Sequence, residues 1–81
     1  MFMKAEQNYR TRSLILAGYI LATGRTHLVA VDKSNPKEVF FVIYDTNLCE
    51  ELVSAYWSDK ALVNPKLLNT KLSELKDQIF N

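Results

Sequence analysis

The segment at residues 39–44, with the sequence VFFVIY, constrains the fold of this chain most strongly. Successive side chains of a strand point to opposite faces of the sheet, and here those on both faces are apolar. Both faces of this strand must therefore be covered. A chain of 81 residues has few elements for this task, because a single layer of helices covers only one face of a small sheet. We therefore expect the second face to be covered by another layer, a second copy of the chain or a ligand.

The composition is that of an ordinary globular chain, with 48% hydrophobic and 23% charged residues and only two glycines and two prolines. The apolar run at residues 14–22 is too short to cross a bilayer, which takes roughly 20 residues. The first eight residues lack the apolar core of a secretion signal, and the lone Cys49 has no partner for an intramolecular disulfide. We predict a cytoplasmic protein without a membrane span. A short extension at residues 1–8 precedes a single domain at residues 9–81.

The first predicted helix spans residues 14–23. Thr11 or Ser13 can cap its start, and Gly24 supplies the residue type that follows many helix ends. Its apolar residues lie on nearly every side, so we expect more than one neighbour to pack on it.

Two segments rich in β-branched and aromatic residues follow, at residues 26–32 and 38–45. The sequence KSNPK at residues 33–37 predicts a turn between them. These signals predict an antiparallel hairpin.

Two further helices are predicted after the hairpin. The sequence DTN at residues 45–47 offers N-caps for a helix that ends near Ser58, and Asn64 with Pro65 begins a third. The apolar stripe of the third helix should pack on the hairpin. The predicted fold is α+β: a helix, a two-stranded antiparallel hairpin and two helices.

Several short motifs with characteristic spacing lie between about Tyr9 and Phe80. They are YxTxSL from Tyr9, AxYxL before Gly24, FFV at residues 40–42, LVxxY at 52–56, VNP at 63–65 and LxxLK at 72–76. In these motifs the chain resembles a domain-of-unknown-function family of short prokaryotic and bacteriophage-type proteins. The resemblance implies a small cytoplasmic protein of a prokaryote or mobile element, and it implies no known activity and no catalytic residue.

The sequence holds no familiar catalytic constellation. It has one histidine and one cysteine, and it contains no Gly-rich phosphate loop, HExxH motif or nucleophile elbow. We expect no enzyme activity, no metal and no cofactor. His27 is expected to be a partly exposed strand residue. Cys49 is either a thiol of lowered pKa in a first helical turn or a small buried apolar group.

Charge is distributed unevenly. Residues 1–37 carry six basic and two acidic side chains, whereas residues 38–59 carry five acidic and no basic ones. On one interpretation Arg10, Arg12 and Arg25 contact phosphates while Tyr9 stacks on a base. The alternative is that these charges are simply solvated, since the net charge is only +1 and nucleic-acid-binding domains are usually more basic.

Aromatic residues give a third clue. Adjacent positions of a helix diverge by about 100°, so one ring of the Tyr56–Trp57 pair should lie at the surface. The candidate interface residues are Tyr19, Phe40, Val42, Tyr56 and Trp57.

Surplus apolar surface on a short chain favours a non-enzymatic binding or interaction module. We expect a homodimer that shares the first helix or the outer face of the aromatic strand, or else a complex with another protein partner. One alternative is a nucleic-acid-binding accessory protein of a phage or mobile element. Another is an inhibitor that binds a host protein through Glu50 and Glu51 of the second helix.

Overall fold

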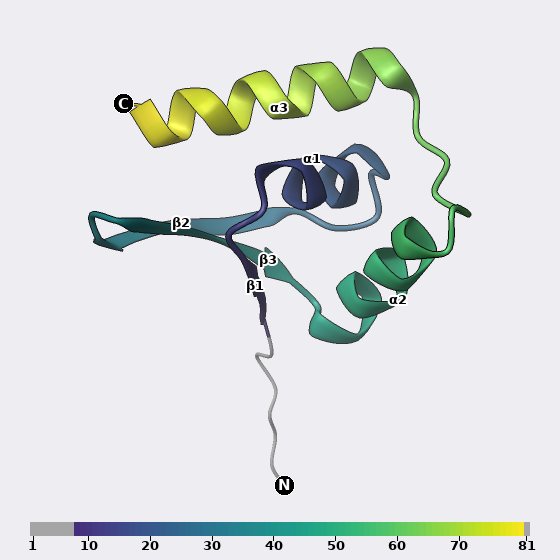
Figure 1. Cartoon of the computed structure of the whole chain (residues 1–81), viewed down its shortest axis with the longest axis horizontal. Coiled ribbons are helices and arrows are strands. Elements are labelled where there is room, and N and C mark those ends of the chain that lie inside the picture. Colours follow the sequence, from purple (N-terminus) through teal and green to yellow (C-terminus); the bar gives the residue numbers. More distant parts are fainter. Residues whose placement is uncertain (1–7, 81) are drawn as a thin grey trace, which may run out of the picture.

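The computed structural model describes residues 8–80 and contains three helices and one three-stranded sheet. In chain order these are β1 (Asn8–Thr11), α1 (Leu14–Ala22), β2 (Leu28–Asn35), β3 (Glu38–Tyr44), α2 (Thr46–Trp57) and α3 (Pro65–Phe80) (Figure 1). The sheet is antiparallel with the strand order β1-β3-β2, so β3 lies in the centre. The α+β class is confirmed.

The prediction of a two-stranded sheet is wrong, because β1 adds a third strand. Its register pairs Asn8 with Tyr44 and Thr11 with Phe41. The strand is four residues long and mostly polar, which is too short for an alternating pattern to appear in the sequence. It therefore includes Asn8, the last residue of the expected extension, while residues 1–7 lie outside the described part.

Local capping determines where the helices begin, as the sequence indicates. The Ser13 hydroxyl accepts a hydrogen bond from the Leu16 N–H at 3.1 Å, and the Asn64 side chain accepts one from the Lys66 N–H at 2.8 Å. At the start of α2 the Asp45 carboxylate plays the same role. Gly24 follows α1 with φ of +74°, a conformation that glycine adopts without steric cost.

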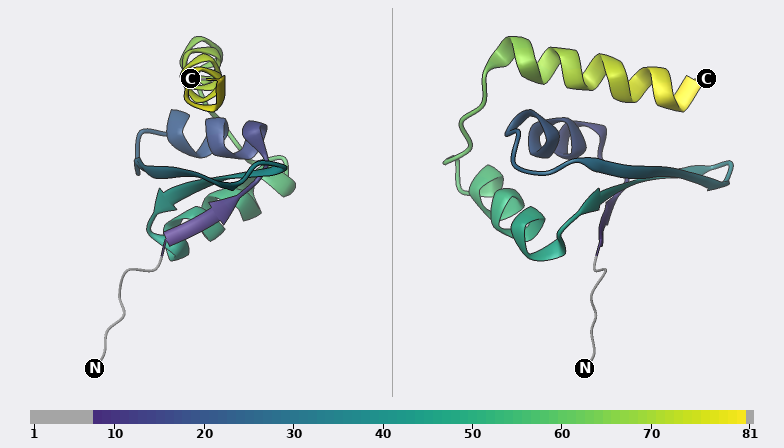
Figure 2. Two further views of the ribbon diagram at one scale, coloured as in Figure 1. Left: turned by 90° about the vertical axis from the view of Figure 1, so that its left-hand side faces the viewer. Right: turned by 180° about the vertical axis from the view of Figure 1, so that it is seen from behind.

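Helix α1 lies between the sheet and α3, and residues 16–22 are all buried (Figure 2). This explains why it is apolar on every side. The expectation that the third helix packs on the hairpin needs correction, because α3 packs mainly on α1. Gly18 makes the close approach possible: a Cβ there would lie 2.5 Å from Leu72 Cδ2. The wide apolar surface of α1 is thus covered from two sides.

Alternate residues of β3 face the helices. Phe41 and Ile43 are fully buried in one core cluster with residues of α1 and α2, including Ile20 and Leu52. The side chains between them point to the opposite side of the sheet. Among residues 8–80, none of the helices combines the length and apolar character that crossing a bilayer requires.

Candidate interaction surface on the open face of the sheet

The side of the sheet turned away from α1 and α2 is the candidate site, and we call it the open face. Strand geometry places every second side chain of β3 on it. The register brings Arg10 of β1 and Ala30 of β2 beside Val42, and Asp32 of β2 beside Phe40. The open face comprises Arg10, Ala30, Asp32, Phe40, Val42 and Tyr44.

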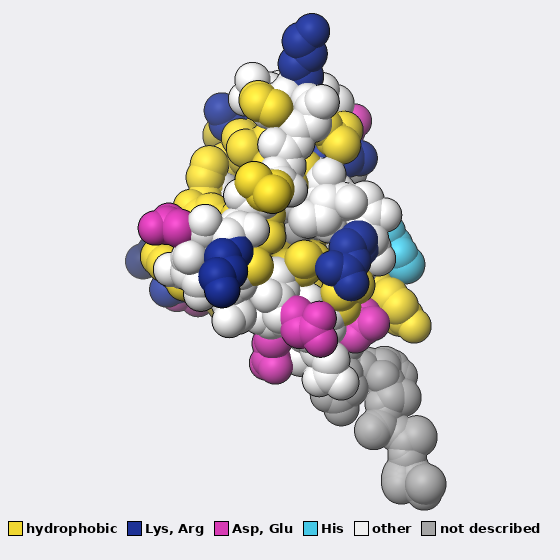
Figure 3. Space-filling model, turned by 90° about the vertical axis from the view of Figure 1, so that its right-hand side faces the viewer, with side chains coloured by type: hydrophobic (Ala, Val, Ile, Leu, Met, Phe, Trp, Pro, Cys, Tyr) yellow, Lys and Arg dark blue, Asp and Glu magenta, His cyan; other side chains and the backbone are white. Residues whose placement is uncertain are grey.

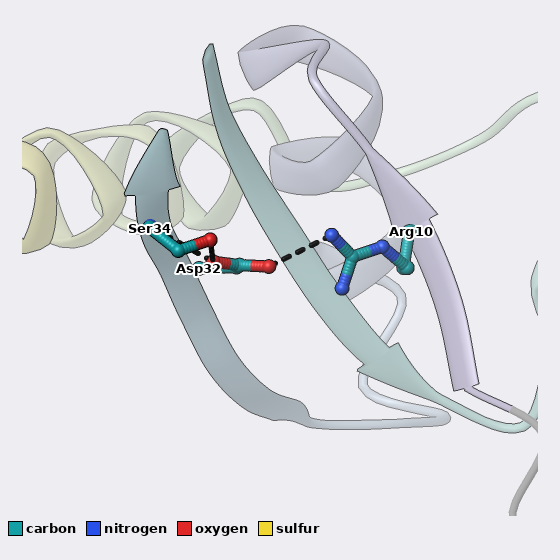
Figure 4. Close-up of polar contacts among 3 residues, drawn as sticks. All are labelled: Arg10, Asp32 and Ser34. Atoms are coloured by element: carbon teal, nitrogen blue, oxygen red, sulfur yellow. Dashed lines mark hydrogen bonds and ion pairs between the residues drawn. The ribbon is translucent and has the colours of Figure 1, made fainter. Parts of the chain in front are cut away.

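An ion pair crosses the open face from one edge strand to the other. Arg10 Nη2 lies 2.8 Å from Asp32 Oδ2, so the pair spans the central strand β3 (Figure 4). The Arg10 guanidinium carbon also lies 4.7 Å from the centroid of the Phe40 ring, within the range of a cation–π contact. Arg10 therefore shields part of the apolar surface that the sequence leaves on this strand.

Ser34 holds the Asp32 carboxylate in place. Its hydroxyl and its backbone N–H both donate to Asp32 Oδ1, at 2.6 Å and 2.9 Å. These bonds, together with the Arg10 guanidinium, hold the pKa of Asp32 well below its ordinary value of 3.8. The carboxylate is thus ionised in the folded state at every physiological pH.

Acid is expected to reduce the stability difference between the wild type and Asp32→Asn. Because folding lowers this pKa, the carboxylate stabilises the fold fully above 3.8, and its contribution is lost as the pH falls below that value. Urea melts of both proteins at about pH 7 and about pH 2.5 measure the effect. The wild type should be the more stable near neutrality, and its advantage should shrink in acid. A constant difference would contradict the assignment.

An aromatic pair occupies the other end of the open face. The His27 and Tyr44 rings stack with centroids 5.2 Å apart and an interplanar angle of 11°. The Tyr44 N–H donates to the His27 carbonyl, and the Thr26 hydroxyl donates to the Tyr44 carbonyl. His27 is exposed, as expected, but it lies just before β2 and not within the strand. The sequence analysis did not include Tyr44 among the candidate interface residues, although a residue two positions after Val42 lies on the same face of a strand.

The structure does not bring the four predicted nucleic-acid contacts together. Tyr9 alternates with Arg10 along β1 and packs against the core, where burial raises its pKa. Arg10 and Arg12 are each held in an ion pair, the latter with Glu38 at 3.0 Å. Arg25 lies in the turn after α1 and lines a different depression of the surface.

The predicted interface residues also separate into groups. Tyr19 is buried, with its ring 5.5 Å from that of Tyr56, because α1 is covered on two sides. The first helix is therefore not a free surface, and that expectation is wrong. Phe40 and Val42 are half-buried on the open face. Trp57 is 71% exposed and meets Tyr56 edge-on, so one ring of that pair does lie at the surface.

Cys49 is a buried residue of α2. Burial, and then the charge of Asp45, raises the pKa of its thiol to about 11. Of the two sequence interpretations, the small buried apolar group is the one the structure supports. Within residues 8–80, no three histidine, cysteine or acidic side chains gather as a metal site would require.

Comparison with protein-family models, with curated proteins and with solved structures finds no match to this chain.

Proposed function

We propose that this protein is a non-enzymatic interaction module that self-associates through the open face of its sheet. The observation that carries the proposal is the alternation of side chains along β3, which places apolar residues on both faces of the sheet. Phe40, Val42 and Tyr44 share one face, and the helices of residues 8–80 pack on the other. Two such faces can pack together as the layers of a β-sandwich do, about 10 Å apart.

The charges of the open face suit contact between two copies. Arg10 is neutralised by Asp32, and the neighbouring Arg12 is neutralised by Glu38. A two-fold interface places the same surface on both sides, so an unpaired charge near the axis would lie close to its own copy. Here the ion pairs remove that repulsion and leave Val42 and Tyr44 as the apolar contact.

The same pairing gives the nucleic-acid alternative less support. A guanidinium group already bound to a carboxylate must exchange that partner for a phosphate, so less free energy is gained. Tyr9, the expected stacking residue, packs on the core instead.

Replacing Val42 by glutamate is expected to abolish self-association, because it puts two like charges at the centre of the contact. Light scattering over a concentration series up to tens of micromolar measures the mass. The wild type should approach the mass of a dimer, and Val42→Glu should stay a monomer while circular dichroism shows it folded.

Phe80→Glu is the matched control. It makes the same apolar-to-acidic change at a side chain 82% exposed on the last turn of α3, which lies on the side of the sheet opposite to the open face. This variant should remain a dimer. A monomeric wild type, or a dimeric Val42→Glu protein, would overturn the proposal.

A further inference from the structure

A second surface feature lies on another side of the molecule, where the end of α1, the second half of α2, the connection at residues 58–64 and the start of α3 meet. These segments enclose an open groove of about 450 Å³. We call it the α1–α3 groove. Its lining includes Tyr19, Leu52, Leu62, Leu67, Arg25 and Lys60.

The apolar rim of this groove is unusually exposed. Leu62 is 91% exposed and Leu67 40% exposed, whereas Tyr19 and Leu52 beneath them are buried. Figure 3 shows this side of the molecule, with hydrophobic side chains gathered in the upper and middle part of the view. An apolar side chain of a partner would cover Leu62 and Leu67, which the chain itself leaves in water.

The charge of the groove has one sign. Among residues 8–80, those that line the groove include two charged side chains, Arg25 and Lys60, and no acidic one. The ion pairs found within residues 8–80 involve neither of these two cations. In Figure 3 Lys and Arg side chains flank the hydrophobic strip, while Asp and Glu gather mainly below it.

We infer that the α1–α3 groove binds a segment of a partner protein that combines apolar anchors with acidic residues. The apolar anchors would rest against Leu62 and Leu67, and the carboxylates would meet Arg25 and Lys60. Amphipathic peptides are bound in this way by grooves whose rim charge is opposite to their own. This site lies away from the open face and does not depend on the self-association proposed above.

Two other occupants suit the geometry less well. The acidic residues Glu50 and Glu51 of a second copy lie on α2, which is itself a wall of the groove. Such a contact would be head-to-tail, and it would extend into a chain unless the rotation closed a ring. A bilayer is flat, whereas the buried floor at Tyr19 and Leu52 is reached only by a group that enters the groove.

A fluorescein-labelled peptide of leucine and glutamate, with its leucines at helical spacing, tests the inference by fluorescence anisotropy. The wild type should bind it, and rising salt should weaken binding. The variant Arg25→Glu with Lys60→Glu should bind about tenfold or more weakly, because two attractive contacts become repulsive. Leu62→Ala should also weaken binding, and it should leave the melting temperature unchanged because the side chain is exposed.

The matched control is Lys33→Glu with Lys76→Glu, which changes the net charge equally at exposed positions outside the groove. It should bind like the wild type. The inference is overturned if the glutamate peptide fails to bind at millimolar concentration, if the corresponding leucine–lysine peptide binds as well, or if the control loses as much affinity as the groove variant. Binding to phosphatidylserine vesicles without binding to the peptide would overturn it in favour of a membrane surface.

Discussion

Replacing Phe41 by alanine is expected to destabilise the protein by about 3–5 kcal/mol. The ring is fully buried at the centre of β3, opposite Thr11 of β1 and Val31 of β2, and it belongs to the core cluster that includes Ile20. Its removal leaves a cavity that the close-packed neighbours fill only in part. Small domains are stable by about 5–15 kcal/mol, so this loss takes a large share of the total.

The neighbouring Phe40 provides the control. It is also a phenylalanine of β3, but it lies half-buried on the open face beneath the Arg10 guanidinium. Phe40→Ala should cost about 1 kcal/mol, mainly through the lost cation–π contact and partial burial. Urea unfolding of the Phe40→Ala and Phe41→Ala variants, at a protein concentration too low for self-association, measures the two losses of stability. Equal losses, or a loss below about 1 kcal/mol for Phe41→Ala, would show that the two faces of β3 are assigned wrongly.

Replacing Gly18 by leucine is the second large change, with an expected loss of about 3 kcal/mol. An added Cβ would lie 2.5 Å from Leu72 Cδ2 and 3.1 Å from Leu72 Cγ, so Leu72 or the whole of α3 must move. The longer leucine side chain would force α3 away from α1. Thermal and urea unfolding measure the loss, and proteolysis should cleave α3 first.

Two comparisons test whether the loss of stability in Gly18→Leu comes from the steric clash between α1 and α3. Gly24→Ala meets no atom within 4 Å, and its φ of +74° should cost only about 1–2 kcal/mol. Adding Leu72→Ala to Gly18→Leu should restore part of the stability, because it removes the clashing atoms. If the double variant is destabilised by the sum of the two single changes, the close approach of α1 to α3 is not the cause.

The sequence was most informative where structure is decided locally. Ser13 and Asn64 cap their helices through side-chain bonds that span two or three residues, and Gly24 adopts its positive φ. The apolar side chains at successive positions of residues 39–44 likewise indicated that both faces of this strand need a cover, and the helices cover the face of Phe41 and Ile43. Each of these signals lies within a few consecutive residues.

What the sequence did not reveal depends on contacts between distant segments. The strand β1 exists because the free edge of β3 is available, and its own sequence carries little strand signal. The Arg10–Asp32 pair joins residues on strands that are not adjacent in the sheet. The α1–α3 groove likewise needs four segments to meet, and the packing of α3 on α1 depends on a single missing side chain at Gly18.

The burial of α1 between two layers has a consequence for how the protein is made. The helix leaves the ribosome well before α3, which covers one of its sides. Until Leu72 and Leu75 have been synthesised, residues 14–22 form an apolar segment with one side open to water. The order of synthesis therefore postpones completion of the core until α3 has been made, and a product that ends before α3 would offer that segment to chaperones and proteases.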